Sequence, residues 1–239
     1  MLFCSISSNA NDAPIKHHYQ FASIEYLFEQ EVGRLVLPQI YLTLGITVDI
    51  SPLPGNRAQY VVNSGEFDGE IMRIWSYGEE NPDTVRVPTP YYYLETMAFV
   101  RSDSLIKVNS VSDLASLRIG RVRGVKHTNN ITEGLTDIYD VHSTQLMFEL
   151  LEQDRIDVAL TNTLDGNVII QSYPFTNIKA MEKPLATLPL YHYLHKKNLP
   201  LVSLLDEKIH ELSASGELKS MITQAENYVI KQYMNTNKH

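Results

Sequence analysis

The apolar residues of the first third of the chain predict strands that alternate with helices. Short apolar runs predict strands over residues 19–24, 46–51 and 67–74. Residues 25–44 carry apolar side chains every three or four positions, which predicts an amphipathic helix that Pro38 is expected to kink or split. Asn56 is expected to cap a second helix that ends near Ser64. Strands joined by crossover helices predict a parallel sheet.

The middle of the chain repeats this pattern. Extended runs predict further strands over residues 94–100, 118–122, 156–161 and 188–195. Ser110 with Asp113 forms a capping pattern for a short helix over 111–116, and Ser143 is expected to cap a helix over 144–153. Residues 199–233 predict a helix that is broken at Gly216 and followed by a second helix.

These elements predict an α/β protein of two lobes, each with a mostly parallel central sheet flanked by helices. Lobe 1 is expected to hold residues 11–101 and 189–239, and lobe 2 residues 102–188. Two crossings, near residues 100–102 and 188–190, would form a two-strand hinge. Ligands of α/β sheets bind where the carboxyl ends of strands meet the N-termini of helices, so we expect a ligand in the cleft between the lobes.

Composition narrows the possible partners. The 239 residues carry a formal net charge of −8 and the isoelectric point is about 5.5, which argues against a nucleic-acid partner. Cys4 is the single cysteine, so an intrachain disulfide and a cysteine-rich metal site are both excluded. No apolar run reaches the length of a membrane-spanning helix.

The first residues resemble the end of a secretory signal. Residues 1–14, MLFCSISSNANDAP, contain a short apolar stretch and then small residues, with Ser8-Asn9-Ala10 as a candidate cleavage site. A positive segment before the apolar stretch is missing, which a start codon placed too late would explain. We expect residues 1–10 to be a remnant of a signal peptide and the protein to be periplasmic; a disordered cytosolic N-terminus is the alternative.

Two arginines of lobe 1 are candidates for binding an anionic group. Arg57 lies at the start of a helix, where a bidentate grip on a carboxylate is possible, although it could also be a solvated loop residue. Arg73 ends a predicted strand and would point into the ligand crevice. Strand alternation from Phe67 places Arg73 on the face opposite Asp68 and Glu70. The alternative for Arg73 is an ion pair with one of these carboxylates.

Aromatic side chains near the first crossing are candidate walls for the pocket. Trp75 and the run Tyr91, Tyr92 and Tyr93 offer apolar faces with polar tips. Three consecutive residues cannot all face one way, so one or two of the tyrosines are expected to pack in the core. We take Trp75, Tyr91 and Tyr92 as candidate ligand contacts.

Lobe 2 offers three further candidates. Arg123 and Gly124 end a strand before a helix, where free backbone N–H groups could bind an anion, or where a tight turn simply needs glycine. Asn162 ends another strand and could hydrogen-bond a ligand or cap a helix. Asp157 is expected to be structural, bonding backbone groups at a strand start.

Catalytic motifs are missing from the sequence. There is no GxSxG, Walker, GxGxxG or HExxH motif. Two histidine pairs, His17 with His18 and His192 with His195, are placed so that their members point apart, so no metal cluster or cofactor is expected. Glu95 is the one carboxylate that an enzyme on this scaffold could use as an acid or base.

Short signatures in a fixed order, over about residues 19–233, resemble the extracellular solute-binding proteins of amino-acid transporters (family 3). The segments that carry the resemblance are GEFDGEIMR (65–73), RVPTPYYYLETMAFVRSD (86–103), SVSDLASLRIGRVRG (110–124), LLEQDRIDVALTN (150–162) and SGEL (215–218). The resemblance implies two lobes of the periplasmic binding protein type II fold that close on a small ligand, a monomer, no catalysis, and delivery of the ligand to an ABC permease.

Two positions depart from the family pattern. Members carry an arginine about nine residues before the Pro90-Tyr91 pair, where it clamps the α-carboxylate of an amino acid; Asn81 stands there. Members also often carry an acidic residue where Asn162 stands, to pair the α-ammonium group. We therefore expect a small polar solute, anionic or amino-acid-like, rather than a named amino acid. Two alternatives stay open: a sensory module for a signalling partner, and a dehydratase-like enzyme on the same scaffold.

Overall fold

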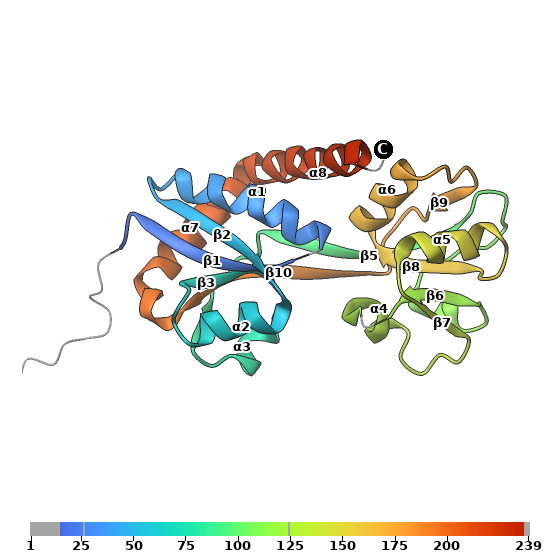
Figure 1. Ribbon diagram of the computed structural model, residues 1–239, viewed down its shortest axis with the longest axis horizontal. Coiled ribbons are helices and arrows are strands. Elements are labelled where there is room, and N and C mark those ends of the chain that lie inside the picture. The colour runs from blue at the N-terminus through green and yellow to red at the C-terminus, as the bar shows by residue number, and fades with distance from the viewer. Residues whose placement is uncertain (1–14, 26, 124, 237–239) are drawn as a thin grey trace, which may run out of the picture. The chain divides into compact units, whose positions relative to one another are not determined.

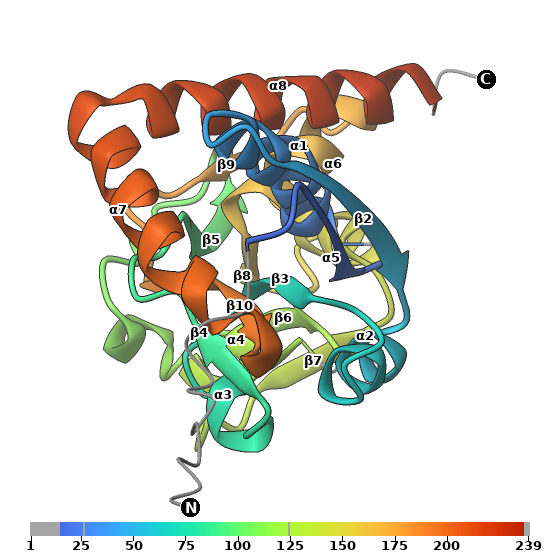
Figure 2. The ribbon, with the colours of Figure 1, turned by 90° about the vertical axis from the view of Figure 1, so that its left-hand side faces the viewer.

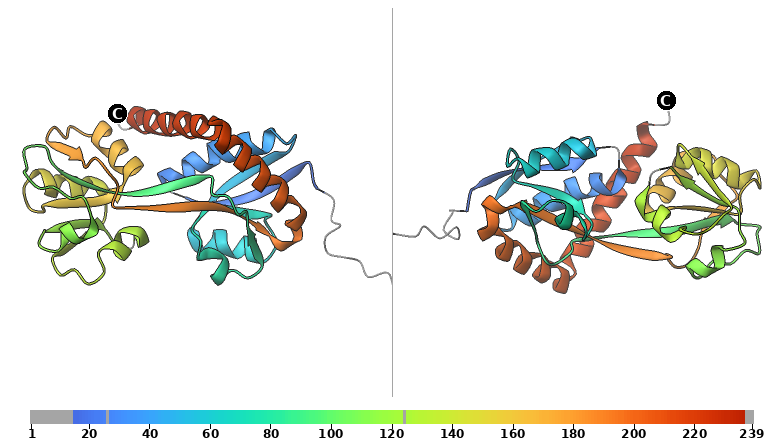
Figure 3. Two further views of the ribbon diagram at one scale, coloured as in Figure 1. Left: turned by 180° about the vertical axis from the view of Figure 1, so that it is seen from behind. Right: turned by 90° about the horizontal axis from the view of Figure 1, so that it is seen from below.

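The computed structural model describes residues 15–25, 27–123 and 125–236 (Figure 1). The chain forms two compact units. Unit 1 holds the residues up to Tyr92 and Pro189–Ala225, and unit 2 holds Tyr93–Leu188 and the residues from Glu226 onward. The chain passes between the units within β5 (Tyr92–Arg101), β10 (Ala186–His195) and α8 (Glu217–Thr236) (Figure 3). The sequence analysis placed the first crossing at 100–102, eight or so residues after the one in the structure. It also placed the whole C-terminal segment in lobe 1, whereas the residues from Glu226 onward belong to unit 2.

Unit 1 is built on a sheet whose first three strands are parallel. Its order is β2-β1-β3-β10, with β4 also paired to β10; β10 runs antiparallel to both β3 and β4. The strands are β1 (His18–Ile24), β2 (Thr47–Leu53), β3 (Gly69–Arg73) and β4 (Thr84–Arg86), with residues 189–195 of β10. The carboxyl ends of β1, β2 and β3 therefore lie at one edge of the sheet.

Helices cover the sheet of unit 1 on both faces. They are α1 (Phe28–Leu42), α2 (Gly55–Asn63), α3 (Tyr77–Glu80) and α7 (Leu199–Ser215), preceded by a 3-10 turn at Lys196–Asn198. Phe21 packs against Tyr41 of α1, while its neighbour Ala22 packs with Val61 and Val62 of α2, so α1 and α2 cover opposite faces. Both α3 and α7 lie beside β4 (Figure 2).

Unit 2 has a second mixed sheet in the order β5-β8-β6-β7, with β9 paired to β5. Strands β6, β7 and β8 are parallel, and β5 runs antiparallel to β8 and β9. The elements are β6 (Ile119–Val122), β7 (Ile138–Val141), β8 (Val158–Asn162), β9 (Ile178–Ala180), α4 (Lys126–Ile131), α5 (Thr144–Glu152), α6 (Thr163–Ser172) and a 3-10 turn at Val111–Leu114. The predicted α/β class, with sheets flanked by helices, is confirmed.

Most predicted elements are present, and the differences have local causes. Helix α1 continues through Pro38 without a break in the assigned helix. The Asn56 cap was wrong: α2 begins at Gly55 after Pro54, and no side chain caps it. Ser143 does cap α5, accepting a 3.2 Å hydrogen bond from the Leu146 N–H. Gly216 separates α7 from α8 in the left-handed conformation, with φ 82°.

Within the part of the chain that the structure describes, every helix is too short or too polar to cross a lipid bilayer.

Candidate functional site

Arg73 ends β3 as predicted, but the strand is irregular there. Tyr193 of β10 pairs with Glu70 while Tyr191 pairs with Arg73, so two residues of β3 oppose one residue of β10. The extra residue is accommodated at Met72, which has a left-handed φ of 52°. Strict alternation is lost at this bulge, and the prediction that Arg73 lies on the face opposite Glu70 was wrong.

The bulge brings Arg73 onto a buried carboxylate. Arg73 Nε lies 2.9 Å from Glu70 Oε1, although the two atoms are not aligned for a hydrogen bond. The Tyr77 hydroxyl donates a 2.6 Å hydrogen bond to Glu70 Oε2, and the Arg73 guanidinium lies 4.5 Å from the centre of the Tyr77 ring. Burial raises the pKa of Glu70, and the charge of Arg73 opposes that shift. The alternative foreseen for Arg73, an ion pair with Glu70, is therefore present, and 17% of its side chain remains exposed.

His192 of β10 is buried and contacts the backbone of the neighbouring strand β3. Its Nδ1 lies 3.0 Å from the Glu70 carbonyl oxygen, and Tyr41 Oη lies 2.9 Å from the Nε2 of His192. A neutral ring that donates from Nδ1 and accepts at Nε2 satisfies both partners. Burial lowers the pKa of His192 to about 4, so the ring is neutral at pH 7. The sequence analysis considered His192 only as a member of a pair with His195 and expected no metal role for it.

Arg86 of β4 is the residue of unit 1 that sequence reasoning missed. Its guanidinium carbon lies 3.0 Å from the centre of the Trp75 ring and 4.9 Å from that of Tyr191. Trp75 is 55% exposed, packs edge-on against Tyr191, and follows β3 by two residues. Trp75 and Tyr191 thus form, with Arg86, an arginine–aromatic cluster. A strand of only three residues, one buried and two half-buried, gave no signal that this arginine would be held in place.

The other candidates of unit 1 have different surroundings. Arg57 is exposed and lies 3.8 Å from Glu66, over the Tyr60 ring. Tyr91 and Tyr92 are both buried, as expected for one or two of the three tyrosines, while Tyr93 is exposed. Their roles as ligand contacts remain predictions.

Asn81, at the position where the family pattern has an arginine, has a structural role. Asn81 is fully buried, and its side-chain oxygen accepts hydrogen bonds from Gln59 and Asn63 of α2. Its amide nitrogen donates to the Tyr77 carbonyl oxygen. Asn81 therefore ties α3 to α2.

In unit 2, Asn162 ends β8 and caps α6. Its side-chain oxygen accepts a 2.7 Å hydrogen bond from the Asp165 N–H, which is the capping role foreseen as the alternative to ligand binding. Across the sheet Asn162 pairs with Thr96 of β5. Because β5 is antiparallel to β8, the first residues of β5 lie at the carboxyl edge of the parallel strands.

Two side chains of β5 at this edge are already hydrogen-bonded. The Thr96 hydroxyl lies 2.8 Å from Nδ1 of His127 in α4, and the Thr163 hydroxyl donates a 2.9 Å hydrogen bond to Glu95. Burial lowers the pKa of His127 to about 4. His127 follows the Arg123-Gly124 turn by only three residues, so its place at a strand–helix junction was readable from the sequence, but its bond to β5 was not.

The strand–helix turn of unit 2 is described only in part. Arg123 is exposed just after β6, and its N–H bonds the Val141 carbonyl oxygen of β7 at 2.8 Å. Gly124 lies outside the described residues, so its role remains a prediction. The neighbouring Arg121 is engaged elsewhere, at 2.8 Å from Asp140.

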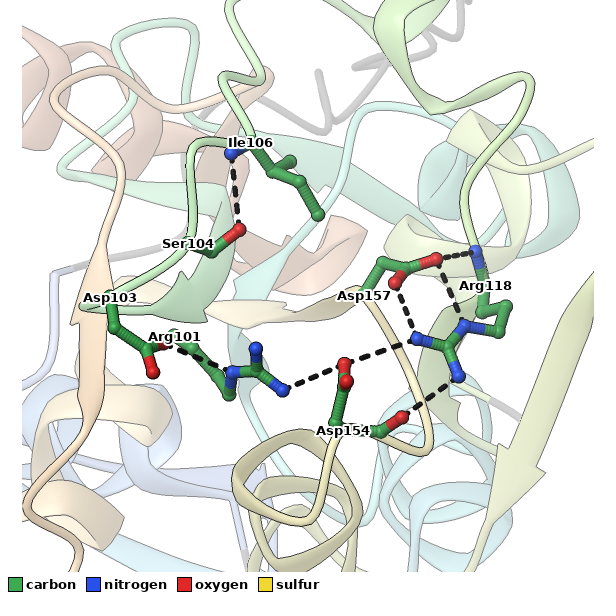
Figure 4. A network of polar contacts seen from close by, with 7 residues as sticks. All are labelled: Arg101, Asp103, Ser104, Ile106, Arg118, Asp154 and Asp157. Carbon is green, nitrogen blue, oxygen red and sulfur yellow. Dashed lines mark hydrogen bonds and ion pairs between the residues drawn. The ribbon is translucent and has the colours of Figure 1, made fainter.

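Asp157 belongs to a network near the start of β8. It accepts hydrogen bonds from the N–H and the guanidinium of Arg118, and Arg118 and Arg101 both contact Asp154 (Figure 4). These bonds join the starts of β6 and β8 to the end of β5. Arg118 holds the pKa of Asp157 below its usual range. A structural role of this kind was expected for Asp157.

Among the described residues, no group of three or more His, Cys, Asp or Glu side chains is arranged so that it could hold a metal ion. The candidate side chains instead offer hydrogen-bond donors, aromatic faces and arginine charges, which suit a small polar ligand.

Comparison with known proteins identifies the fold. No protein-family model matches the chain. An uncharacterized protein from Shewanella oneidensis is 26% identical over 218 residues, covering 88% of this chain and 78% of that protein.

Among solved structures, the GluR0 ligand-binding core in complex with L-glutamate aligns with a TM-score of 0.68 at 13% identity, covering 87% of this chain and 97% of that one. The amino-acid ABC transporter substrate-binding protein AbpA from Streptococcus pneumoniae, bound to L-arginine, aligns with a TM-score of 0.60 at 17% identity, over 90% and 96% of the two chains. This chain has the fold of a periplasmic binding protein.

A sensor domain of a histidine kinase, described as similar to periplasmic binding proteins, aligns equally well, with a TM-score of 0.60 at 17% identity over 87% and 96% of the chains. The periplasmic binding protein fold predicted from the sequence is therefore confirmed, and it occurs in both transport and sensory proteins.

Proposed function

We propose that this chain is a solute-binding protein that captures a small polar solute, anionic or amino-acid-like, for an ABC importer. The observation that carries the proposal is the pair of strand ends in a periplasmic binding protein fold. One bears Arg73 with the arginine–aromatic cluster, and the other bears Asn162 beside Thr96 and His127. These groups provide charge, aromatic surface and directed hydrogen bonds without a metal or cofactor.

The mechanism is a shift of population. A solute that contacts residues of both units only in a closed state favours that state by its differential affinity. In this proposal the permease recognises the closed form, and the protein acts outside the inner membrane after removal of a leader. Solute-binding neighbours such as AbpA support the transport role.

The test is a thermal-shift screen of the purified protein, refolded first to remove solute carried through purification. The panel contains amino acids, small carboxylates, phosphate esters, polyamines and sugars. A ligand that binds only the native state at 100 times its dissociation constant adds about 2.7 kcal/mol, which raises the melting temperature by roughly 5–10 °C for a chain of this size. A panel in which no solute raises the melting temperature would refute the proposal.

A sensory role is the second candidate, and the histidine kinase sensor domain among the neighbours favours it. Genes for a permease and an ATPase next to this gene would support transport, and a kinase or cyclase gene would support sensing. A dehydratase-like enzyme has less support: Glu95 is held by Thr163, and the neighbours described above are binding proteins or a sensor.

A further inference from the structure

The four arginines of unit 1 differ in how their charge is balanced. Arg34 lies 3.5 Å from Glu31, Arg57 3.8 Å from Glu66, and Arg73 2.9 Å from Glu70. Arg86, in contrast, has no carboxylate within 4.0 Å among the residues that the structure describes. The charge of Arg73 is already used to balance a buried glutamate, so Arg86 is the arginine of unit 1 whose charge no carboxylate contacts among the described residues.

Aromatic side chains, rather than an acid, hold Arg86 in place. Residues paired across neighbouring strands point to the same face, and Tyr193 of β10 pairs with Arg86 on one side and Glu70 on the other. The guanidinium extends along this face to Trp75 and Tyr191, and lies beside the Tyr193 hydroxyl, where burial raises the pKa of Tyr193 and a side-chain hydrogen bond from Arg86, together with its charge, opposes that shift. Contact with ring faces stabilises the cation and fixes its plane.

One of the N–H donors of Arg86, the one on Nε, also lacks a hydrogen-bond acceptor. Arg86 Nε is buried and has no hydrogen-bond partner. A buried donor without a partner costs free energy, and native proteins satisfy nearly all such groups with protein, water or ligand. Carboxylate and phosphate oxygens match the N–H donors along the edge of a planar guanidinium in a bidentate fashion.

We infer that Arg86, positioned by Trp75 and Tyr191, binds an oxyanion group of the solute, of the carboxylate or phosphate type. The inference rests on the proposed solute-binding function and makes it more specific. It assigns the anion contact of unit 1 to Arg86 instead of Arg73, whose charge Glu70 already balances.

The single tryptophan gives a local test that needs no known solute. Trp75 is the only tryptophan of the chain, so its fluorescence reports on the immediate surroundings of Arg86. Quenching by iodide, an anion, is compared with quenching by neutral acrylamide at constant ionic strength. The iodide-to-acrylamide ratio is expected to fall about twofold in Arg86→Gln, because the local positive potential is lost. It should not change in Arg155→Gln, which removes an exposed arginine of unit 2.

Competition between iodide and other anions then tests whether Arg86 forms a specific binding site or only adds positive charge to the surface. Succinate, glutamate, inorganic phosphate and glycerol phosphate are titrated into the iodide-quenched protein, with glucose and putrescine as neutral and cationic controls. Saturable protection by carboxylates alone, or by phosphates alone, identifies which oxyanion Arg86 takes. Absence of saturable protection by any of the four anions would overturn the inference.

The thermal-shift screen separates this inference from the proposed function. For an anionic solute that stabilises the wild type, Arg86→Gln is expected to raise the dissociation constant about tenfold to a hundredfold, the effect of losing one or two charge-assisted hydrogen bonds. Arg86→Lys keeps the positive charge but loses the planar guanidinium that can bind an oxyanion with two parallel hydrogen bonds. Iodide quenching should therefore persist while solute affinity falls. If a solute stabilises wild type and Arg86→Gln equally, the proposed function stands and the inference fails.

Discussion

Each unit holds a carboxylate whose pKa burial raises, Glu70 within β3 of unit 1 and Asp165 in the first turn of α6 of unit 2, and the two are balanced in different ways. In unit 1, Glu70 is fully buried and faces a cation, Arg73, and one hydroxyl, Tyr77. In unit 2, Asp165 accepts 2.5 Å hydrogen bonds from the hydroxyls of Thr144 and Thr161, and among the described residues no cation lies within 4.0 Å of it. Burial raises the pKa of both groups.

The difference is reflected in the backbone. In unit 2 the pairing of β5 with β8 is regular from Phe99 to Thr96, and the hydroxyls come from residues in ordinary conformations. In unit 1 the cation reaches Glu70 only because Met72 adopts a left-handed conformation and shifts the register. A strained residue persists where surrounding contacts hold it, and Gln30 supplies one by donating a 3.1 Å hydrogen bond to the Met72 carbonyl oxygen. A left-handed residue thus lies beside the carboxylate Glu70 in unit 1, whereas in unit 2 the left-handed residue Asp154, with φ 58°, lies in the ion-pair network of Arg101 and Arg118 and away from Asp165.

The largest effect is expected from removing the cation of unit 1. Arg73→Ala leaves a fully buried carboxylate without its charge partner, which typically costs about 3–5 kcal/mol. Urea unfolding followed by Trp75 fluorescence measures the loss in the unit that contains it. The matched control is Arg57→Ala, whose exposed pair with Glu66 should contribute less than about 1 kcal/mol.

A double variant tests whether the stability lost in Arg73→Ala comes from the uncompensated charge of Glu70. Replacing both partners, Glu70→Gln with Arg73→Gln, removes the uncompensated charge and should restore much of the stability lost in Arg73→Ala. If the double variant is no more stable than Arg73→Ala, the ion pair is not what Arg73 contributes, and the contrast with Asp165 loses its basis.

Acid is expected to weaken the fold through the buried histidines. The pKa of His192 is about 4 in the folded protein and near 6.5 when unfolded, so below pH 6.5 the unfolded chain takes up the proton first. Stability is therefore kept above pH 6.5 and lost as the pH falls towards 4, by about 3 kcal/mol for a shift of this size. His127 acts in the same direction and, being only partly buried, by less. Glu70 and Asp165, whose pKa is raised, act in the opposite direction.

The measurement is the free energy of urea unfolding at a series of pH values from 8 to 4. His192→Gln can still donate to the Glu70 carbonyl and accept from Tyr41, so the variant should fold, although with lower stability at pH 8. Because glutamine does not titrate, the dependence of the unfolding free energy on pH should be flatter between pH 6.5 and 4. A variant with the same slope as wild type would show that His192 is not the group responsible. Asp68, whose pKa is lowered to about 2 by Lys16 and other donors, loses its contribution only at still lower pH.

The fold was largely predictable, because apolar spacing and caps such as Ser143 act locally. The contacts of the candidate site residues were less predictable from the sequence. Arg73 was placed correctly at the end of β3, but its partner depended on a bulge that alternation does not reveal. Arg86 was missed because its environment is made by Trp75, which follows β3, and by Tyr191, which comes from a distant part of the chain. Pairings of this kind depend on register, which composition and periodicity leave open.

The smallest effect separates the two roles of Asn162, capping and binding. Asn162→Ala removes the acceptor of the Asp165 N–H and should cost about 1 kcal/mol, the usual value of an N-cap. Asn162→Asp keeps an acceptor and adds a negative charge at the helix N-terminus, so its stability should match or exceed that of wild type. The aspartate cannot donate, however, and it would repel an anionic solute. If Asn162 contacts the solute, Asn162→Asp will weaken solute binding without loss of stability. Equal affinity in wild type and Asn162→Asp, measured by thermal shift with the same solute, would leave Asn162 as a cap alone and place anion recognition on the unit 1 side.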